Sequence, residues 1–181
     1  GKSGEHEVSL MSATSVIRAI DPEKFQVVMV GITKKGQWLL YEGPVEAVIP
    51  GEWQAKAEED LRRDPGHFSL CILGQGPNTL ADRIDFALPI LHGPNGEDGT
   101  VQGLLELLNI PYGGCGVLGA ATTMDKITAK KVFAHEGIRQ APYIDLNARD
   151  LEKGAQWILD RVAAELGYPV FVKPSNMGSS V

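Results

Sequence analysis

The sequence predicts an α/β protein in which a parallel sheet carries helices on both faces. Two observations predict this fold class. Short apolar runs alternate with amphipathic segments along most of the chain. The clearest runs, residues 25–32 and 85–91, are almost continuously apolar, which is typical of strands buried on both faces. Because such sheets bind ligands at the carboxyl ends of their strands, the loops after these runs are where a site is expected.

The first two thirds of the chain give a series of predicted elements. Apolar residues at helical spacing predict a helix over residues 5–20, which Asp21-Pro22 ends because the residue before a proline disfavours helical backbone. The elements expected after it are strands over 25–32, 36–41, 67–73 and 85–91 and helices over 52–63 and 100–110. The segment from 43 to 83, rich in Gly, Pro and charge, is the hardest to interpret.

A domain boundary is expected near residue 121, which gives a first domain over 1–121 and a second over 122–181. The second part has its own alternation of elements. These are a helix over 125–137 that Gly137 closes, a strand over 141–146, a helix over 151–167 and a strand over 168–174. So small a part cannot close a core alone, and Gly1 opens directly into a turn. We therefore expect the chain to be a piece of a longer protein.

Composition excludes several classes of protein. The net charge of −6 argues against a sequence-independent nucleic-acid binder, which needs a basic surface. No apolar run has the length to cross a bilayer, and the N-terminus does not have the pattern of a signal peptide. The two cysteines, Cys71 and Cys115, favour reduced thiols over a disulfide framework. These features predict a cytoplasmic protein that binds neither nucleic acid nor membrane.

The sequence does not support either of two common nucleotide-binding motifs. Residues 114–119, GCGVLG, fit G-x-G-x-x-G, but that pattern binds a dinucleotide only between a strand and a helix of a βαβ unit. Because a proline and little strand precede it, a structural loop is predicted. No G-x-x-x-x-G-K-[ST] sequence is present either.

Other residues are candidates for phosphate binding. Lys173 precedes a turn of Gly178, Ser179 and Ser180, whose backbone N–H groups and hydroxyls could hold phosphate. A solvated turn explains the same residues equally well. Lys126, near the start of a predicted helix, is either a second phosphate ligand or an ordinary surface lysine.

Polar residues also gather at two loops of the first domain. Glu5 and Glu7 lie at a helix N-terminus, where the helix dipole favours acids and where a carboxylate could instead hold a ligand's ammonium group. His92 leaves a buried strand into a glycine-rich turn and is either a site residue or a turn histidine. Asp98 is the expected N-cap of the next helix. One histidine with two acids is a weak signal for metal.

The order of three blocks is more specific than any single motif. GKSGEHEVSL, then LPILHGPNGEDGTVQGLLELLNIPYGGCGVLGAATTMDK, then YPVFVKPSNMGSSV closely resemble D-alanine–D-alanine ligases of the ATP-grasp superfamily. The resemblance covers nearly the whole chain except residues 43–83. It implies a Rossmann-like domain with a parallel sheet that precedes the first part of an ATP-grasp domain.

The resemblance also implies roles for the candidate residues. Glu5 would orient the ammonium group of the first D-alanine, with His92 beside the same substrate. Lys126 and Lys173 would contact the phosphates of ATP, and Ser179 would hydrogen-bond toward Glu5. Gly178 and Ser180 belong to the same phosphate loop. ATP and Mg²⁺, or Mn²⁺, are the implied cofactors, with no metal ligand in this chain, and such ligases pair as homodimers.

The implied reaction joins two D-alanines for peptidoglycan synthesis through an acyl phosphate. A D-alanine–D-lactate ligase and another ATP-grasp carboxylate–amine ligase remain as alternatives, since the choice depends on contacts that the blocks do not include. A non-enzymatic nucleotide-binding module is a further alternative. The 181-residue chain by itself is expected to be inactive.

Overall fold

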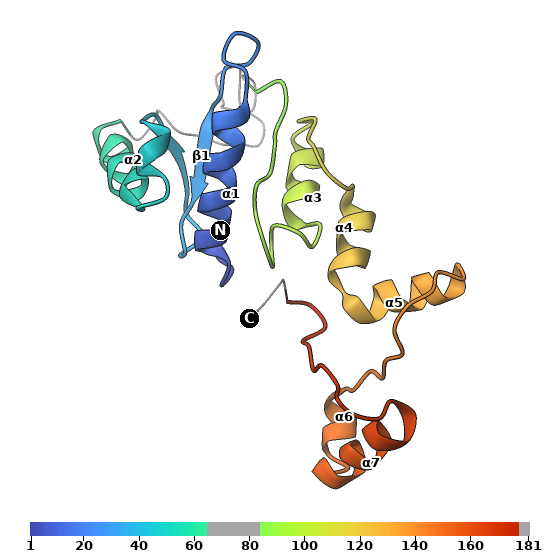
Figure 1. The fold of residues 1–181 in the computed structure, drawn as a ribbon. Coiled ribbons are helices and arrows are strands. Elements are labelled where there is room, and N and C mark those ends of the chain that lie inside the picture. The colour runs from blue at the N-terminus through green and yellow to red at the C-terminus, as the bar shows by residue number, and fades with distance from the viewer. Residues whose placement is uncertain (65–83, 178–181) are drawn as a thin grey trace. The chain divides into compact units, whose positions relative to one another are not determined.

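The computed structural model describes residues 1–64 and 84–177 (Figure 1). The described residues divide into two compact units, one of residues 1–64 and 84–124 with Met177, and the other of residues 125–176. Each unit is described separately below. The strand predicted over 67–73, together with Cys71, Gly178, Ser179 and Ser180, lies outside the described residues.

The first unit is mainly helical in its described residues. Its elements are α1 (His6–Ala19), β1 (Met29–Ile32), β2 (Trp38–Tyr41), η1 (Val45–Ala47), α2 (Glu52–Arg63), α3 (Thr100–Leu107) and α4 (Val117–Met124). The predicted helices over 5–20, 52–63 and 100–110 are confirmed, two of them with shorter ends. A glycine in the left-handed region precedes both α2 and α3, namely Gly51 (φ +83°) and Gly99 (φ +92°).

The strands of this unit differ from the prediction. β1 and β2 pair antiparallel, from Met29 opposite Tyr41 to Ile32 opposite Trp38. The run 25–32 is a strand only from Met29 onward, and 85–91 contributes only an isolated parallel bridge between Ala87 and Tyr112. A parallel sheet is therefore not formed by the described residues. An apolar run indicates burial but does not specify the neighbour that supplies ladder hydrogen bonds.

A core fills the space between the hairpin and α2. Its buried residues are Leu39, Tyr41, Val48, Trp53 and Ala57. The rings of Tyr41 and Trp53 meet edge to face, with their centroids 6.5 Å apart. A second cluster of Val101, Leu105 and Ile110 buries the inner face of α3. These clusters fix the hairpin and α3, the elements on which the loops of the candidate site depend.

Gly31 in β1 lets the indole ring of Trp53 pack directly on the strand. A Cβ atom at Gly31 would fall 2.5 Å from Trp53 Cη2. We expect Gly31→Ala to lower the free energy of unfolding by about 1–3 kcal/mol, because overpacking moves a buried ring. Chemical unfolding of the full-length protein measures this change.

Gly103→Ala in α3 is the matched control. The nearest atom to its added Cβ is a Val117 methyl at 3.8 Å, an ordinary contact. Alanine is favoured over glycine inside a helix by about 0.5–1 kcal/mol, so this variant should be neutral or stabilised. Equal destabilisation by both substitutions would contradict the packing account.

The GCGVLG motif is partly helical. Gly114 (φ +136°) and its neighbours up to Gly116 form an irregular turn, as predicted for a structural loop, but α4 already begins at Val117. The loop prediction is therefore wrong for residues 117–119. Their small and apolar side chains are compatible with a helix, and the Ala120 N–H donates to the Gly116 carbonyl.

The second unit contains α5 (Lys126–His135), α6 (Ala148–Leu151) and α7 (Ala155–Glu165). The helix predicted over 125–137 is confirmed, and Gly137 (φ +69°) follows its end. The helix predicted over 151–167 is interrupted, because Gly154 (φ +93°) separates α6 from α7. No helix in residues 1–64 or 84–177 combines the length and apolarity that a membrane span requires.

The strands predicted over 141–146 and 168–174 are wrong for the structure. Neither forms ladder hydrogen bonds with another part of residues 125–176. Phe171 and Val172 are more than nine-tenths exposed. Strand-forming residues become a strand only where a second strand accepts their hydrogen bonds, and local sequence does not supply that partner.

Candidate functional site: a buried carboxylate beside a glycine-rich loop

The Glu5 side chain lies at the start of α1 and is buried. Only 9% of the residue is exposed. Its backbone carbonyl accepts from the Ser9 N–H at 3.0 Å, so the residue is fixed to the first turn of the helix. Its Oε2 atom is shielded from solvent and has no hydrogen-bond partner among the described residues. A buried carboxylate oxygen without a partner is unfavourable unless a ligand supplies one.

Gly93 forms the wall beside this carboxylate. Its φ of +75° is a left-handed conformation, and an added Cβ would fall 2.5 Å from Glu5 Oε2 and 3.0 Å from Ser3 Cβ. The Gly93 N–H donates to Glu97 Oε2 at 2.6 Å, which holds the turn closed. Only glycine combines this backbone conformation with such a close approach to Glu5.

His92, the residue before Gly93, is held by three serines. Ser3 Oγ donates to the His92 carbonyl at 2.6 Å, and the His92 N–H donates to Ser9 Oγ at 3.0 Å. Ser12 Oγ lies 3.0 Å from His92 Nε2, a hydrogen bond in which either atom can donate. The glycine-rich loop and the start of α1 are thus joined, and the His92–Gly93 segment adjoins Glu5.

The rest of the loop is fixed by two side chains from its far end. Asp98 accepts from the N–H groups of Asn95 (2.9 Å) and Thr100 (3.1 Å). Burial alone would raise the pKa of Asp98. The hydrogen bonds from Asn95 and Thr100 lower it by more than burial raises it, so the pKa lies below its ordinary value. Gln102 Nε2 donates to the Gly96 carbonyl at 3.1 Å. Asp98 was expected to be the N-cap of α3; that position belongs to Gly99, although the Asp98 carboxylate still binds the Thr100 N–H.

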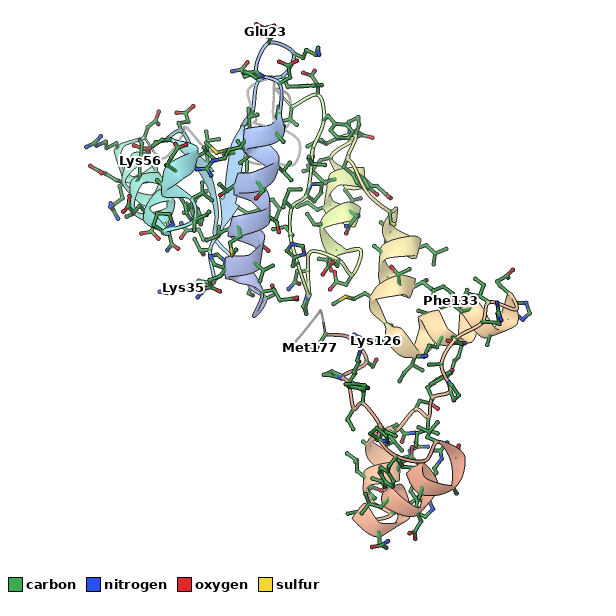
Figure 2. The ribbon with its side chains drawn as sticks, in the orientation of Figure 1. Glu23, Lys35, Lys56, Lys126, Phe133 and Met177 are labelled. Carbon is green, nitrogen blue, oxygen red and sulfur yellow. The ribbon has the colours of Figure 1, made fainter. Side chains whose placement is uncertain are left out.

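In the second unit, hydrogen bonds join the segments of the two candidate lysines. Lys126, labelled in Figure 2, opens α5, and its N–H donates to the Ser175 carbonyl at 3.0 Å. Ser175 Oγ in turn donates to the Asp125 carboxylate at 2.7 Å. Lys173, two residues before Ser175, is exposed. The chain segments of both lysines therefore meet at the N-terminus of α5.

Asp125 is the N-cap of α5, and its pKa depends on the hydrogen bonds that join the 125–126 and 173–175 segments. The Thr128 N–H donates to its Oδ1 at 2.6 Å, and with the Ser175 hydroxyl it lowers the pKa of Asp125 from 3.8 to about 2. Because the folded-state pKa lies below the unfolded one, the stabilisation is present above pH 3.8 and is lost as the pH falls toward 2.

We expect an NMR titration of the Asp125 carboxyl to have its midpoint near pH 2. Ser175→Ala removes one of the donors and should move that midpoint upward toward the ordinary value. A midpoint that stays unchanged in Ser175→Ala would show that the 125–126 and 173–175 segments are not joined in this way.

Metal ligands are a separate question. Within residues 1–64 and 84–177, no group of three or more His, Cys, Asp or Glu side chains could hold a metal ion. Cys115 is exposed and free.

The sequence indicated some of this site and missed the rest. Glu5, His92 and Lys126 were singled out as candidates. The sequence did not predict roles for Ser3, Ser9, Ser12, Gly93 and Ser175, although the three-residue spacing of Ser9 and Ser12 places both hydroxyls on one face of α1. That spacing indicates a shared helix face for these two serines, and it does not indicate their partner.

Comparison with known protein families gives matches over most of the chain. Residues 1–115 match the family model described as "D-ala D-ala ligase N-terminus", and residues 132–181 match "D-ala D-ala ligase C-terminus". A D-alanine–D-alanine ligase of Acetivibrio thermocellus is 46% identical over 194 residues. One of Geobacillus kaustophilus is 48% identical over 184 residues. Each alignment covers 100% of this chain and 52% or 50% of the relative.

Solved structures give the same result. The VanG D-Ala:D-Ser ligase of Enterococcus faecalis superposes with a TM-score of 0.74 at 33% identity, over 99% of this chain and 51% of that one. A D-alanine–D-alanine ligase of Bacillus anthracis complexed with ATP gives a TM-score of 0.57 at 32% identity, over 98% of this chain and 45% of that one.

These matches define the chain as the N-terminal domain of such a ligase followed by the start of its C-terminal domain. The chain belongs to the D-alanine–D-alanine ligase family. It spans about half the length of the curated relatives that it matches.

Proposed function

We propose that the full-length protein joins two D-alanines in an ATP-dependent reaction that supplies D-alanyl-D-alanine for peptidoglycan synthesis. The observation that carries this proposal is the unpartnered Oε2 atom of Glu5, buried beside Gly93 and the loop of His92. A small ligand with an ammonium group supplies the missing partner of such a carboxylate. The family membership of the chain supports D-alanine as that ligand.

The phosphate-binding part of the proposal rests on Lys126 and Lys173. Hydrogen bonds tie their segments together at the N-terminus of α5, and lysine acts on phosphate as a mobile point charge. Gly178, Ser179 and Ser180 complete this part of the proposal as the phosphate loop, with Ser179 linked toward Glu5. The ATP bound to a related ligase of Bacillus anthracis supports the choice of nucleotide.

In the proposed reaction, ATP supplies the phosphoryl group that activates the carboxylate of the first D-alanine, and the amine of the second then displaces phosphate. The residues of this chain position and stabilise rather than react. Glu5 orients the first ammonium group, and the lysines stabilise negative charge on the transferred group. The proposal includes Mg²⁺ because of the family to which the chain belongs. None of the described residues is assigned as a ligand of this metal.

Two further parts of the proposal follow from the family. Because the proposed reaction consumes ATP, we assign the protein to the cytoplasm. Pairing of two copies through the N-terminal domain is the oligomeric state that the family favours.

A coupled assay of the full-length protein tests the proposed function. With ATP and Mg²⁺, D-alanine should release phosphate and give D-alanyl-D-alanine, identified by mass spectrometry. D-lactate and D-serine, offered with limiting D-alanine, test the alternative second substrates; VanG, a structural neighbour, is named as a D-Ala:D-Ser ligase. An absence of phosphate release with every acceptor would overturn the proposal.

A further inference from the structure

Two serines on one face of α1 hold both the backbone and the ring of His92. Ser9 Oγ accepts from the His92 N–H at 3.0 Å, and Ser12 Oγ lies 3.0 Å from Nε2. The three-residue spacing brings both hydroxyls to the same side of the helix. His92 is separated from them by about eighty residues of sequence, so the contact is made by the fold and not by local geometry.

The contact of Ser12 differs from those of its neighbours on the helix. Thr14 and Ser15 donate their hydroxyls to the carbonyls four residues earlier, at 2.8 Å and 3.1 Å, as helical hydroxyl groups commonly do. Ser12 is instead hydrogen-bonded to an imidazole. Since a neutral imidazole has one donor and one acceptor nitrogen, occupation of Nε2 leaves Nδ1 as the nitrogen available to a ligand.

We propose that Ser12 is a positioning residue for the substrate site. It fixes the ring orientation of His92, so that Nδ1 is presented to the amino acid held by Glu5. This inference rests on the proposed function for the identity of that amino acid. The geometry of the Ser12–His92 pair itself does not depend on it. Ser9 contributes separately by fixing the His92 backbone, and through Gly93 that segment adjoins Glu5.

Three variants of the full-length protein test this role. Ser12→Ala removes the hydroxyl, and Ser12→Thr restores it on the same helix. Ser15→Ala is the matched control, since Ser15 lies one turn further along, is exposed and donates its hydroxyl to the carbonyl of Met11. Two quantities are measured: the ¹⁵N chemical shift of His92 Nε2 in histidine-labelled protein, assigned with His92→Gln, and the KM values for D-alanine and ATP.

In Ser12→Ala we expect the Nε2 shift to move and KM for the first D-alanine to rise about 2- to 10-fold, the range for loss of one neutral hydrogen bond. The KM for ATP and kcat should stay within about 2-fold. Ser12→Thr should restore both readouts, and Ser15→Ala should change neither.

An unchanged Nε2 shift in Ser12→Ala would overturn the inference, as would an equal rise in both KM values, which indicates general structural damage. These outcomes are separable from failure of the proposed function. If the Nε2 shift moves and recovers in Ser12→Thr while the protein shows no D-alanine-dependent turnover, the positioning of His92 stands and the assigned substrate is wrong.

Discussion

Glu5→Gln in the full-length protein is expected to lower kcat/KM for the first D-alanine by roughly 30-fold to several thousand-fold. The glutamine keeps the shape of the side chain but removes the charge that pairs with the ammonium group. Losing one partner of a buried charged pair costs roughly 2–5 kcal/mol. Because the ammonium group is bound before and during the reaction, most of the loss should appear as a higher KM. Steady-state kinetics at saturating ATP measure the effect.

Glu7→Gln is the matched control for this substitution. Glu7 lies in the same first turn of α1, but its side chain is exposed and pairs with Lys34. Exposed ion pairs contribute little, so the KM for D-alanine should not change. An unchanged KM in Glu5→Gln would mean that Glu5 only stabilises the helix N-terminus, the alternative that its sequence position allowed.

Lys173→Ala should cause the second large loss, of about 10²- to 10³-fold in turnover, together with weaker ATP binding. A preorganised donor to the transferred group is worth roughly 3–4 kcal/mol in the transition state. Its exposure in the structure leaves the ammonium group accessible to a nucleotide. Initial rates as a function of ATP concentration separate the effect on kcat from that on KM.

Lys131→Ala serves as the control in the same unit. Lys131 is an exposed lysine of α5 that pairs with Asp145 at 3.6 Å, and its loss should leave turnover unchanged. Wild-type turnover in Lys173→Ala would assign Lys173 to a solvated turn and remove it from the proposed phosphate site.

The predictable part of the fold is the part that local sequence determines. The helix over Glu52–Arg63 and the end of α5 just before Gly137 follow from side-chain spacing and from the backbone that glycine permits. The strand over 168–174 was predicted from the same kind of local signal and is wrong, because a strand also needs a pairing partner. The break at Gly154 was missed since one glycine inside a helical pattern is usually tolerated.

The candidate site, like the fold, could be predicted from the sequence only in part. Glu5 and His92 were candidates with an equally ordinary structural explanation each, and only the resemblance to D-alanine–D-alanine ligases gave them roles at a substrate. The spacing of Ser9 and Ser12 indicates only that they share a face of α1. Their partner His92 could not be identified from it, since the contacts cross eighty residues of chain. Ser175 was missed for the same reason: its bond to Asp125 joins positions fifty residues apart. Sequence thus indicated the groups that we propose to meet a ligand but not the groups that hold them.

The most direct test is a crystal structure of the full-length protein with D-alanine and a non-hydrolysable ATP analogue. It should place the amino nitrogen of the first D-alanine within about 2.7–3.2 Å of Glu5 Oε2, the span of a hydrogen bond. The phosphates should then lie against Lys126 and Lys173. A D-alanine bound elsewhere, with Glu5 Oε2 paired to a protein group, would contradict the account.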